Sequence, residues 1–452
     1  MKNGGSVFRF LSRIETMKKL IQKIFCLLAR LCIIRHKPFV VGITGSFGKT
    51  TARHVITEVL RRANRDVWTP EWNYNGEWGF AFSVLQIRSH GRNILSWIGM
   101  FFSAISTIIR SDYPEILVLE YGVDHVGEMD IQINIVEPDI ILFTRLSPSH
   151  IEGFGTVEAY YAEKEKVLRR AHKKTYAIGN ADDRKQADFS CQVWYGTDSD
   201  VSDFVMSDIL EHPDGLELDA LFAGQEYHIV SPILWEHHAG ILAGAFLVAQ
   251  KMEIPPLEII SYMRHIHLPH ARWNVLKWIN ESLVIDGTYN GWFEPIVAGV
   301  EMLVRLAEKE SRKTIALIGD MRELGALEAL RHRELWEKLS SFPVDYYIFV
   351  GAVCMEIIQP MVKESWREKT FFTLDSRVAG EYIRSLITSD PDKFLLFAKG
   401  SQNTIYLEEA LKYFIFPEEY LKLARQDELY THKKKHFYTS HFPDSEAQKH
   451  LL

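Results

Sequence analysis

Residues 44–50 read Thr-Gly-Ser-Phe-Gly-Lys-Thr, a set of residue types suited to binding a nucleotide phosphate. Backbone N–H groups of a glycine-containing turn can face an anion, the lysine can reach the terminal phosphates, and the last threonine can hold Mg²⁺. The apolar run 39–44 before this segment predicts a buried strand, and the pattern of residues 50–63 predicts a helix. A strand, a glycine turn ending in Lys-Thr and a helix together predict an ATP site. The general motif has a further glycine five positions before Gly48, where this chain has Ile43.

Further groups of polar residues and glycines follow this phosphate loop along the chain. The earlier ones are residues 73–79, residues 120–122 with Gly127 and Glu128, residues 150–155 with Lys164, and residues 180–183. The later ones are Arg272, residues 286–290, residues 319–325 with His332, and residues 399–401. In type and order, these groups and the phosphate loop resemble the signatures of the Mur ligases, the peptidoglycan amino-acid ligases related to folylpolyglutamate synthase. The resemblance covers residues 36–415, and segment 319–325 is similar to one best developed in the family's D-alanyl-D-alanine-adding ligase.

The resemblance implies an ATP-dependent carbon–nitrogen ligase. In the implied reaction, a carboxylate attacks the γ-phosphate of ATP to give an acyl phosphate, and an amine then attacks that group and expels phosphate. The protein's part is to position the reactants and to neutralise phosphoryl charge. The implied activity adds D-alanyl-D-alanine or a related amino compound to a cell-wall peptide precursor. Two alternatives stay open: a different acceptor (a lipid-linked muropeptide, a polyglutamate or a pseudomurein peptide), and a non-catalytic nucleotide-binding protein on the same scaffold.

The resemblance also implies roles for individual residues. The implied catalytic residues are Lys49, His150 and Lys164, the last of which is often carbamylated by CO₂ in the family. The implied ATP-binding residues are Thr44, Gly45, Ser46, Gly48, Lys49, Thr50, Thr51, Asn180, Arg272 and Asp286. The implied ligands of Mg²⁺, or of Mn²⁺, are Thr50, Glu120, His150 and, if carbamylated, Lys164. The implied substrate contacts are Asn75, Tyr289, Asn290, Glu323 and Lys399.

Several of these residues also have a purely structural interpretation. Lys164 lies in the charged stretch 163–166, which by itself is typical of a solvated helix face, so its carbamylation stays open. Arg272 and Asp286 could form ion pairs at a domain joint, and segment 319–325 could be an ordinary strand-to-helix connection. The nearby histidines at 265, 267 and 270 could hold a metal, but we interpret them as hinge residues without that function.

The chain departs from the family pattern at several positions. Fewer than 40 residues precede Phe39, so the family's N-terminal UDP-binding domain is not part of the resemblance. Residues 291–293 read Gly-Trp-Phe where the family has Ala-Asn-Pro, and Gln402 replaces an arginine. We therefore expect the ATP chemistry to be kept and the contacts with adenine and substrate to differ.

Short apolar runs alternate with helical patterns from residue 39 onward, which predicts an α/β fold with a mostly parallel sheet. The expected strands are residues 39–44, 115–120, 139–144, 314–318, 346–350 and 394–397. We predict an N-terminal amphipathic helix (1–35), a P-loop central domain (36–268), a C-terminal Rossmann-like α/β domain (269–425) and a flexible tail (426–452).

Residues 18–37 carry apolar side chains at spacings of three and four, interrupted by Lys23 and Arg30, which predicts an amphipathic helix. Two interpretations stay open: a helix that packs on the next domain, and an interfacial helix whose basic residues lie at lipid headgroups. The charges fit a membrane span poorly, and no signal-peptide cleavage pattern follows. A second apolar run, 94–109, could share either role. We expect a cytoplasmic protein, with peripheral membrane contact through residues 18–37 left open.

The composition excludes several classes of function. A net charge of −7, from 52 basic and 59 acidic residues, disfavours a protein that coats nucleic acid or a motor that moves along it. The four cysteines are scattered, which suits a reducing compartment and predicts neither a disulfide framework nor a paired-cysteine metal site. We expect a monomer whose partner is a small molecule or a peptide precursor.

Overall fold

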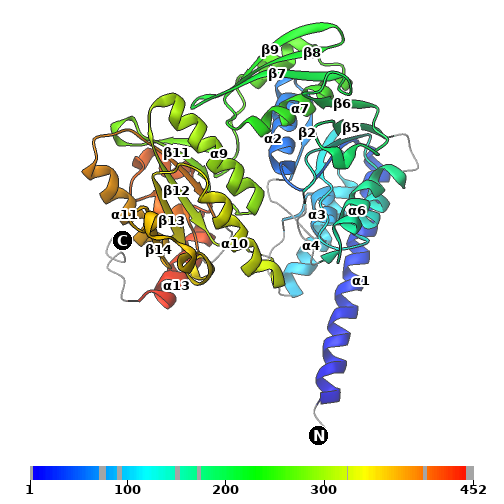
Figure 1. Ribbon diagram of the computed structural model, residues 1–452. Helices are drawn as coiled ribbons and strands as arrows, with labels where there is room; N and C mark the ends of the chain where they lie inside the picture. Colours follow the sequence, from blue (N-terminus) through cyan, green and yellow to red (C-terminus); the bar gives the residue numbers. More distant parts are fainter. Residues whose placement is uncertain are drawn as a thin grey trace. The chain divides into compact units, whose positions relative to one another are not determined.

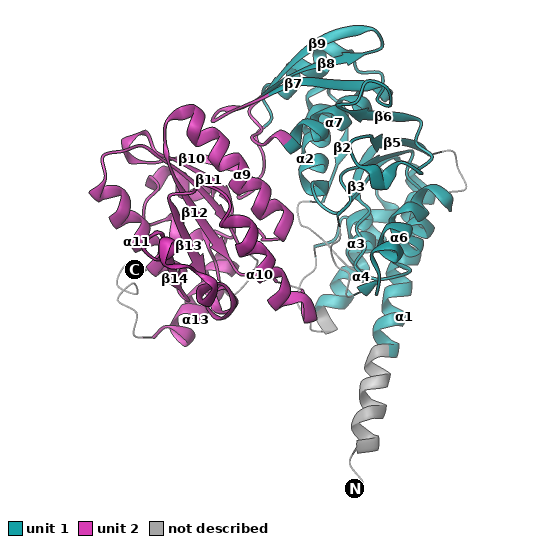
Figure 2. Cartoon of the chain, in the orientation of Figure 1, with its two compact units in different colours: residues 1–209, 217–230, 237–266 teal, residues 210–216, 231–236, 267–452 magenta. Residues whose placement is uncertain are grey.

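A computed structural model describes residues 4–70, 78–88, 94–147, 153–170, 175–322, 324–400 and 405–443. The chain forms two compact units (Figure 2). Unit 1 consists of residues 1–209, 217–230 and 237–266, and unit 2 of residues 210–216, 231–236 and 267–452. Each unit is centred on a β-sheet covered by helices (Figure 1).

The sheet of unit 1 has nine strands in the order β2-β3-β1-β4-β5-β6-β7-β8-β9. They are β1 (Phe39–Thr44), β2 (Val67–Trp68), β3 (Ile116–Glu120), β4 (Ile140–Phe143), β5 (Tyr176–Asn180), β6 (Val193–Gly196), β7 (Phe204–His212), β8 (Gly215–Phe222) and β9 (Gln225–Ser231). Neighbouring strands from β2 to β7 pair in parallel. Strands β1, β3 and β4 are almost continuously apolar and buried, as expected for parallel strands covered on both faces. The sequence patterns predicted β1, β3 and β4 of this sheet, and did not predict β2 or the strands from β5 to β9.

Two groups of helices pack on this sheet. The helices are α1 (Gly4–His36), α2 (Lys49–Arg62), α3 (Gly79–Leu85), α4 (Ile94–Ile109), α5 (Glu128–Ile135), α6 (Val157–Arg169), α7 (Ala239–Lys251) and α8 (Pro256–Met263). One group is α2, α7 and α8, which contact one another. In the other group, α1 contacts α3, α4 and α5, and its Phe25 shares a core with Leu117 and Leu119 of β3. Helix α1 occupies the segment predicted as an N-terminal helix (1–35), and its part within residues 18–37 has a buried face.

Unit 2 has a six-stranded sheet in the order β10-β11-β15-β12-β13-β14. Its strands are β10 (Asn274–Lys277), β11 (Leu283–Gly287), β12 (Lys313–Gly319), β13 (Tyr346–Val350), β14 (Thr370–Thr373) and β15 (Phe394–Lys399). Strand β10 is antiparallel to β11, and every other pair is parallel. The helices are α9 (Phe293–Glu310), α10 (Glu328–Leu339), α11 (Ser376–Ser389), α12 (Glu408–Leu411) and α13 (Glu428–His441). The prediction of a mostly parallel α/β fold is confirmed.

The predicted flexible tail from residue 426 is wrong for most of its length. Residues Glu428–His441 form helix α13, which begins at the N-cap Asp427. Lys434 and Tyr438 of this helix are buried, with Tyr438 hydrogen-bonded to Ser376 and Lys434 paired with two glutamates. The segment does not fray, because Lys434 points inward to the carboxylates of Glu408 and Glu409, which are buried and lie 25 or more positions away in the sequence.

Candidate active site

The phosphate loop lies where three parallel strands end. Strand β1 pairs with β3 on one side and β4 on the other, so the loop after Thr44 meets the segments after Glu120 and Phe143. In open α/β sheets, ligands bind at this carboxyl edge of the strands. Gly45 (φ 142°) and Gly48 (φ 84°) adopt backbone angles that favour glycine. A Cβ at Gly45 would also lie 1.9 Å from Thr144 Oγ1, so no other residue fits there without rearrangement.

Side chains from distant segments fix the shape of this loop. Ser46 Oγ donates to Ser147 O (2.7 Å) and accepts from Ser147 N (2.8 Å) and from Tyr160 Oη (2.9 Å). Thr144 Oγ1 lies 2.8 Å from Phe47 O, to which it donates. Sequence reasoning assigned Ser46 to ATP and missed the other residues. Ser46 also serves as an internal support of the loop, since its hydroxyl hydrogen-bonds to protein groups on either side.

Two lysines converge on a single carbonyl oxygen of the loop. Lys49 Nζ lies 2.8 Å and Lys164 Nζ 3.0 Å from Gly45 O, and Lys49 Nζ also donates to Ser46 O (3.2 Å). Burial, and then the charge of Lys164, lower the pKa of Lys49. Burial lowers the pKa of Lys164 to about 7, although Asp124, Glu128 and Glu163 oppose the shift. These two crowded amino groups lie beside the start of α2, where no side chain caps the first backbone N–H groups, and a bound phosphate anion would stabilise their charged forms.

Lys164 is not on a solvated helix face. Its side chain is 1% exposed, and Nζ lies 4.7 Å from the centroid of the Tyr160 ring. The adjacent Glu163 is also buried, and its Oε1 accepts from the backbone N–H groups of Gly127 and Met129 (2.9 and 3.0 Å). Two residues of the charged stretch 163–166, Glu163 and Lys164, are therefore buried. This excludes a solvated helix face as the interpretation of Lys164.

Glu120 stands at the end of β3, directly opposite Ile43 in the register of the sheet. Its Oε1 lies 3.0 Å from Arg53 Nε, and the pair is mostly buried. Thr50, the second residue of α2, is half-buried at the same edge of the sheet. Carboxylate and hydroxyl oxygens are the donors that Mg²⁺ prefers, so these two side chains fit the cation that the loop motif implies.

The described part of the predicted segment 150–155 returns to the same edge. His150 lies outside the described residues, but a Cβ at Gly153 would lie 1.9 Å from Asp124 O. The Asp124 turn is itself held by Glu128, whose Oε2 accepts from the N–H groups of Asp124 (2.6 Å) and His125 (3.2 Å). Glu128, predicted only as part of a signature, therefore acts as a buried support for the turn.

Asn180 ends β5 and forms a tight turn with the residues after it. Its Oδ1 accepts from Asp182 N, and its own N–H donates to Gln186 Oε1, both at 3.0 Å. Asp183 Oδ2 accepts from the N–H of Leu146 (2.5 Å), which ties this turn to the segment after β4. The predicted nucleotide-side turn thus adjoins the carboxyl edge that carries the phosphate loop. Thr51, also predicted to contact ATP, is buried in α2.

Unit 2 gathers a second set of predicted residues at the end of β11. Asp286 is fully buried, and its Oδ1 accepts from the N–H (2.9 Å) and the hydroxyl (2.7 Å) of Thr288. Its Oδ2 has no hydrogen-bond partner among the residues that the structure describes. Burial raises the pKa of Asp286 to about 6. An unsatisfied carboxylate oxygen of this kind is costly unless a ligand supplies a donor.

Lys399 and Arg272 lie around the same turn. Lys399 Nζ donates to Gly287 O (3.0 Å) and to Asn290 Oδ1 (3.2 Å), and the Arg272 guanidinium lies 4.1 Å from the centroid of the Tyr289 ring. Burial, and then the charge of Arg272, lower the pKa of Lys399 to about 7. The structure therefore brings together five of the predicted residues of unit 2, namely Arg272, Asp286, Tyr289, Asn290 and Lys399.

A buried charge cluster supports this turn from behind, and sequence reasoning missed it. Arg425 donates to both carboxylate oxygens of Glu408 (2.8 and 2.7 Å) and to the carbonyl oxygens of Thr288 (2.9 Å) and Tyr289 (3.1 Å). Lys434 Nζ lies 2.9 Å from Glu408 Oε1 and 2.7 Å from Glu409 Oε1. We name Arg425, Glu408, Glu409 and Lys434 the charge cluster. No local spacing rule joins these residues, because α12, residue 425 and α13 meet only in the folded unit.

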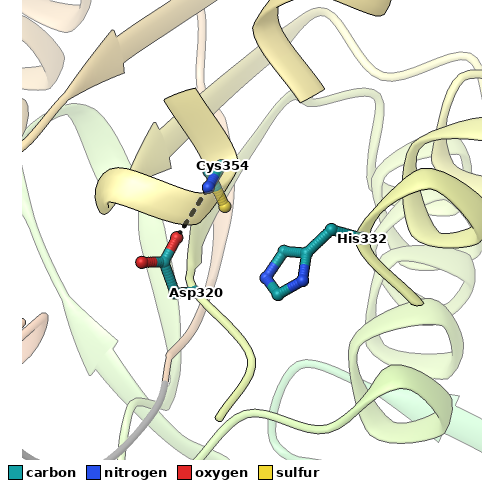
Figure 3. A group of neighbouring side chains, drawn as sticks. All are labelled: Asp320, His332 and Cys354. Atoms are coloured by element: carbon teal, nitrogen blue, oxygen red, sulfur yellow. Dashed lines mark hydrogen bonds between the residues drawn. The ribbon is translucent and has the colours of Figure 1, made fainter. Parts of the chain in front are cut away.

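Asp320 of segment 319–325 forms another buried group with His332 and Cys354. The ligand-type atoms of the three residues lie within 4.8 Å of one another (Figure 3). The Asp320 carboxylate accepts from the N–H groups of Cys354 (2.8 Å) and Val353 (3.2 Å). His332 Nε2 accepts from Met321 N (3.0 Å), and its Nδ1 lies 2.8 Å from Glu328 O. Both ring nitrogens are thus engaged with backbone, and burial together with Asp320 raises the pKa of the Cys354 thiol. The group is suited to shaping the segment and has no free nitrogen lone pair for a metal.

Three predicted residues, Asn75, His150 and Glu323, lie outside the described residues. The hinge histidines at 265, 267 and 270 do not belong to a metal-type group within the part of the chain that the structure describes.

Known proteins share both the phosphate-loop unit and the overall fold of this chain. Residues 43–249 match the Mur ligase middle domain. The UDP-N-acetylmuramoyl-tripeptide–D-alanyl-D-alanine ligase of Bacillus subtilis is 26% identical over 337 residues, which are 73% of this chain and 66% of that protein. The ligase of the same name from Escherichia coli is 22% identical over 380 residues, covering 82% of this chain and 76% of that protein. Among solved structures, the MurF ligase of Thermotoga maritima in complex with ADP superposes with a TM-score of 0.70 at 21% identity, covering 89% of this chain and 84% of that chain.

Proposed function

Because residues 43–249 match the Mur ligase middle domain, we propose that this chain is a Mur-type, ATP-dependent ligase that joins an amine to a carboxylate of a cell-wall peptide precursor. The proposed amine is D-alanyl-D-alanine, which the names of its relatives specify for those proteins. The observation that carries the proposal is the pair Lys49 and Lys164 on the Gly45 carbonyl oxygen, in a loop that only glycines can form.

The loop and Lys49 would bind the β- and γ-phosphates of ATP. Lys49 is the first residue of α2, whose start has no side-chain cap, and burial lowers the pKa of this lysine. The substrate carboxylate attacks the γ-phosphorus and releases ADP, and the amine then attacks the acyl phosphate and releases phosphate. Positioned positive charge stabilises the phosphoryl group during transfer.

Thr50 and Glu120 would hold a Mg²⁺ ion, or Mn²⁺, with His150 and a carbamylated Lys164 as further ligands. Such an ion supplies charge neutralisation of the phosphates when it is bound. Arg53 keeps the Glu120 carboxylate at the carboxyl edge of the sheet, because its Nε lies 3.0 Å from Oε1. The low pKa of Lys164, about 7, leaves a large fraction of neutral amine, the form that reacts with CO₂.

The residues of unit 2 would contact the remaining parts of the reactants. Asp286 and Arg272, with Asn180 of unit 1, are proposed for the nucleotide. Tyr289, Asn290 and Lys399, with Asn75 and Glu323, are proposed for the substrate. The unsatisfied Oδ2 of Asp286 and the stacking of Arg272 on Tyr289 support a ligand site at this turn.

The test is incubation of the chain with ATP, Mg²⁺, UDP-N-acetylmuramoyl-tripeptide and D-alanyl-D-alanine, followed by mass spectrometry of the product. We expect a product extended by the dipeptide and one ADP per product, with none from the Lys49→Ala variant. If ADP and phosphate appear only when some other acceptor and amine are both present, the chain is still a ligase, but the proposed acceptor and amine are wrong. If nucleotide binds but no pair of acceptor and amine stimulates ADP release, the chain is a non-catalytic nucleotide-binding protein and the proposal fails.

We also propose a cytoplasmic monomer, since the substrates of this reaction are small precursor molecules. No helix in the described part of the chain is long and apolar enough to cross a membrane.

A further inference from the structure

Helix α1 has two apolar faces, of which unit 1 covers only one. Phe25, Ala29 and Cys32 are buried against the rest of the unit. The opposite side exposes a row of large apolar side chains, which are between 39% and 60% exposed: Met17, Leu20, Ile24, Leu27, Leu31 and Ile34. Their spacings of three and four place them in one stripe along the helix. We name these six residues the outer stripe of α1.

Helix α4 lies beside α1 and adds to the exposed apolar surface. The two helices run in the same direction, because Phe25 contacts Trp97 (6.1 Å between ring centroids) and His36 contacts Thr107 (3.1 Å from Nε2 to O). Figure 2 shows both at the edge of unit 1. Four large side chains of α4 are exposed, namely Ile98, Phe101, Phe102 and Ile109. A soluble monomer seldom exposes apolar side chains in such concentration, so this surface is suited to a partner.

The charges beside the outer stripe are all of one sign. Residues 17–39 contain six lysines and arginines and no aspartate or glutamate, and helix α4 has no charged residue at all. All six are exposed. Lys19, Lys23 and Arg30 follow one another at spacings of four and seven, which places them in a row next to the apolar stripe.

Two occupants could cover this surface, and the charges decide between them. The 3–4 spacing also suits a coiled coil with a second copy of the chain. In that arrangement the flanking lysines and arginines of the two copies would face one another and repel. An anionic lipid surface instead attracts every one of these cations while the stripe enters the boundary between headgroups and acyl chains.

We propose that α1 and α4 dock unit 1 on an anionic phospholipid bilayer, with α1 lying in the plane of the interface. The outer stripe of α1 and the exposed side chains of α4 enter the membrane surface, and the basic row contacts lipid phosphates. The phosphate loop does not take part in the membrane contact, since none of its residues belongs to the outer stripe.

The test is flotation of the purified full chain with vesicles. We expect it to float with vesicles of phosphatidylcholine containing about 30% phosphatidylglycerol, and to float much less with pure phosphatidylcholine or at about 0.5 M salt. Leu20→Ser with Leu27→Ser should lower the partition coefficient at least tenfold. Leu221→Ser with Leu257→Ser is the matched control, since these leucines are exposed elsewhere on unit 1, and it should float like the wild type.

A second comparison isolates the charges. Lys19→Gln, Lys23→Gln and Arg30→Gln together should lower binding to the anionic vesicles about tenfold or more. Lys277→Gln, Lys433→Gln and Lys435→Gln, which neutralise three exposed lysines of unit 2, should leave it unchanged.

Three results would overturn the proposal: no flotation of the wild type, flotation that survives both α1 variants, or equal loss in the control variants. Absence of flotation together with a dimer that Leu20→Ser and Leu27→Ser abolish would assign the surface to a second copy. Ligase activity without vesicles should be equal in the wild type and the leucine variants, so this test and that of the catalytic function can fail separately.

Discussion

Replacement of Glu408 by Gln should loosen the turn at residues 286–290 without touching any residue of that turn. Glu408 is fully buried between two cations, Arg425 and Lys434, whose side chains are 5% and 7% exposed. Burial alone would raise the pKa of Glu408, but the hydrogen bonds and charge of Arg425, with Lys434, hold it below its usual value. The carboxylate is therefore charged at neutral pH, and its neutral replacement leaves an excess buried cation.

The size of the effect follows from that imbalance. Removing one partner of a buried ion pair costs about 3–5 kcal/mol, because the remaining charge stays desolvated and unpaired. Lys434→Met should cost less, since Glu408 keeps its pair with Arg425 and Glu409 keeps its pair with Lys412 (3.0 Å from Nζ to Oε1). The double variant Glu408→Gln with Lys434→Met restores the balance of one cation, Arg425, and one anion, Glu409. We expect its cost to be smaller than the sum of the two single costs by about 2 kcal/mol or more.

The assay is native-state hydrogen exchange, read for the peptide that contains β11 and the turn after it. A loss of about 3 kcal/mol corresponds to exchange faster by roughly a hundredfold. The Michaelis constant for ATP should rise in the single variants, because Arg425 holds the carbonyl groups of Thr288 and Tyr289. Glu364→Gln, an exposed glutamate of unit 2, is the control. Additive costs, within about 0.5 kcal/mol, would refute the idea that these residues act as one cluster.

Three further predictions concern the lysines. Lys49→Ala should abolish substrate-dependent phosphate release with the fold intact by circular dichroism, whereas Arg61→Ala on the exposed side of α2 should not; retained turnover would remove the phosphate loop from the mechanism. Lys164→Ala should lower activity with partial rescue by small carboxylates, and full activity would leave this lysine with only its hydrogen bond to Gly45 O. Lys399 loses its proton at about pH 7 when folded and near its ordinary, higher pKa when unfolded, so its contribution makes stability rise with pH above about 7. Lys399→Met should lower that slope in urea unfolding by up to about 1.4 kcal/mol per pH unit, and an unchanged slope would contradict the lowered pKa.

The sequence predicted well whatever depends on local pattern. Apolar runs of four to six residues between turn residues marked the strands around the phosphate loop, because parallel strands covered on both faces must be apolar throughout. Strands β5 and β11, which carry Asn180 and Asp286, were not predicted. The phosphate loop was also recognisable from local sequence, because its glycines, lysine and threonine all lie within seven consecutive residues. Strands β7 to β9 were missed, because their exposed and polar positions resemble those of loops.

The residues that hold the site in shape could not be read from spacing. Tyr160 and Ser46 are 114 positions apart, and Arg425 and Thr288 are 137 apart, so only the order of strands in each sheet brings them together. Lys164 shows the same limit, because its neighbours in the sequence are charged while its neighbours in space are Tyr160 and the phosphate loop.

By itself, the sequence determined the class of fold, the position of the phosphate loop and the family whose signatures follow it. All of these can be recognised from short segments and from their order along the chain. The tertiary structure decided which charges are buried, that two lysines share one carbonyl oxygen, that the basic tail is a helix anchored on glutamates, and that α1 leaves one apolar face exposed. The physical reason is that burial and ion pairing depend on which residues the folded chain places around a side chain. Local periodicity does not specify these contacts, because they join segments that are distant in the sequence.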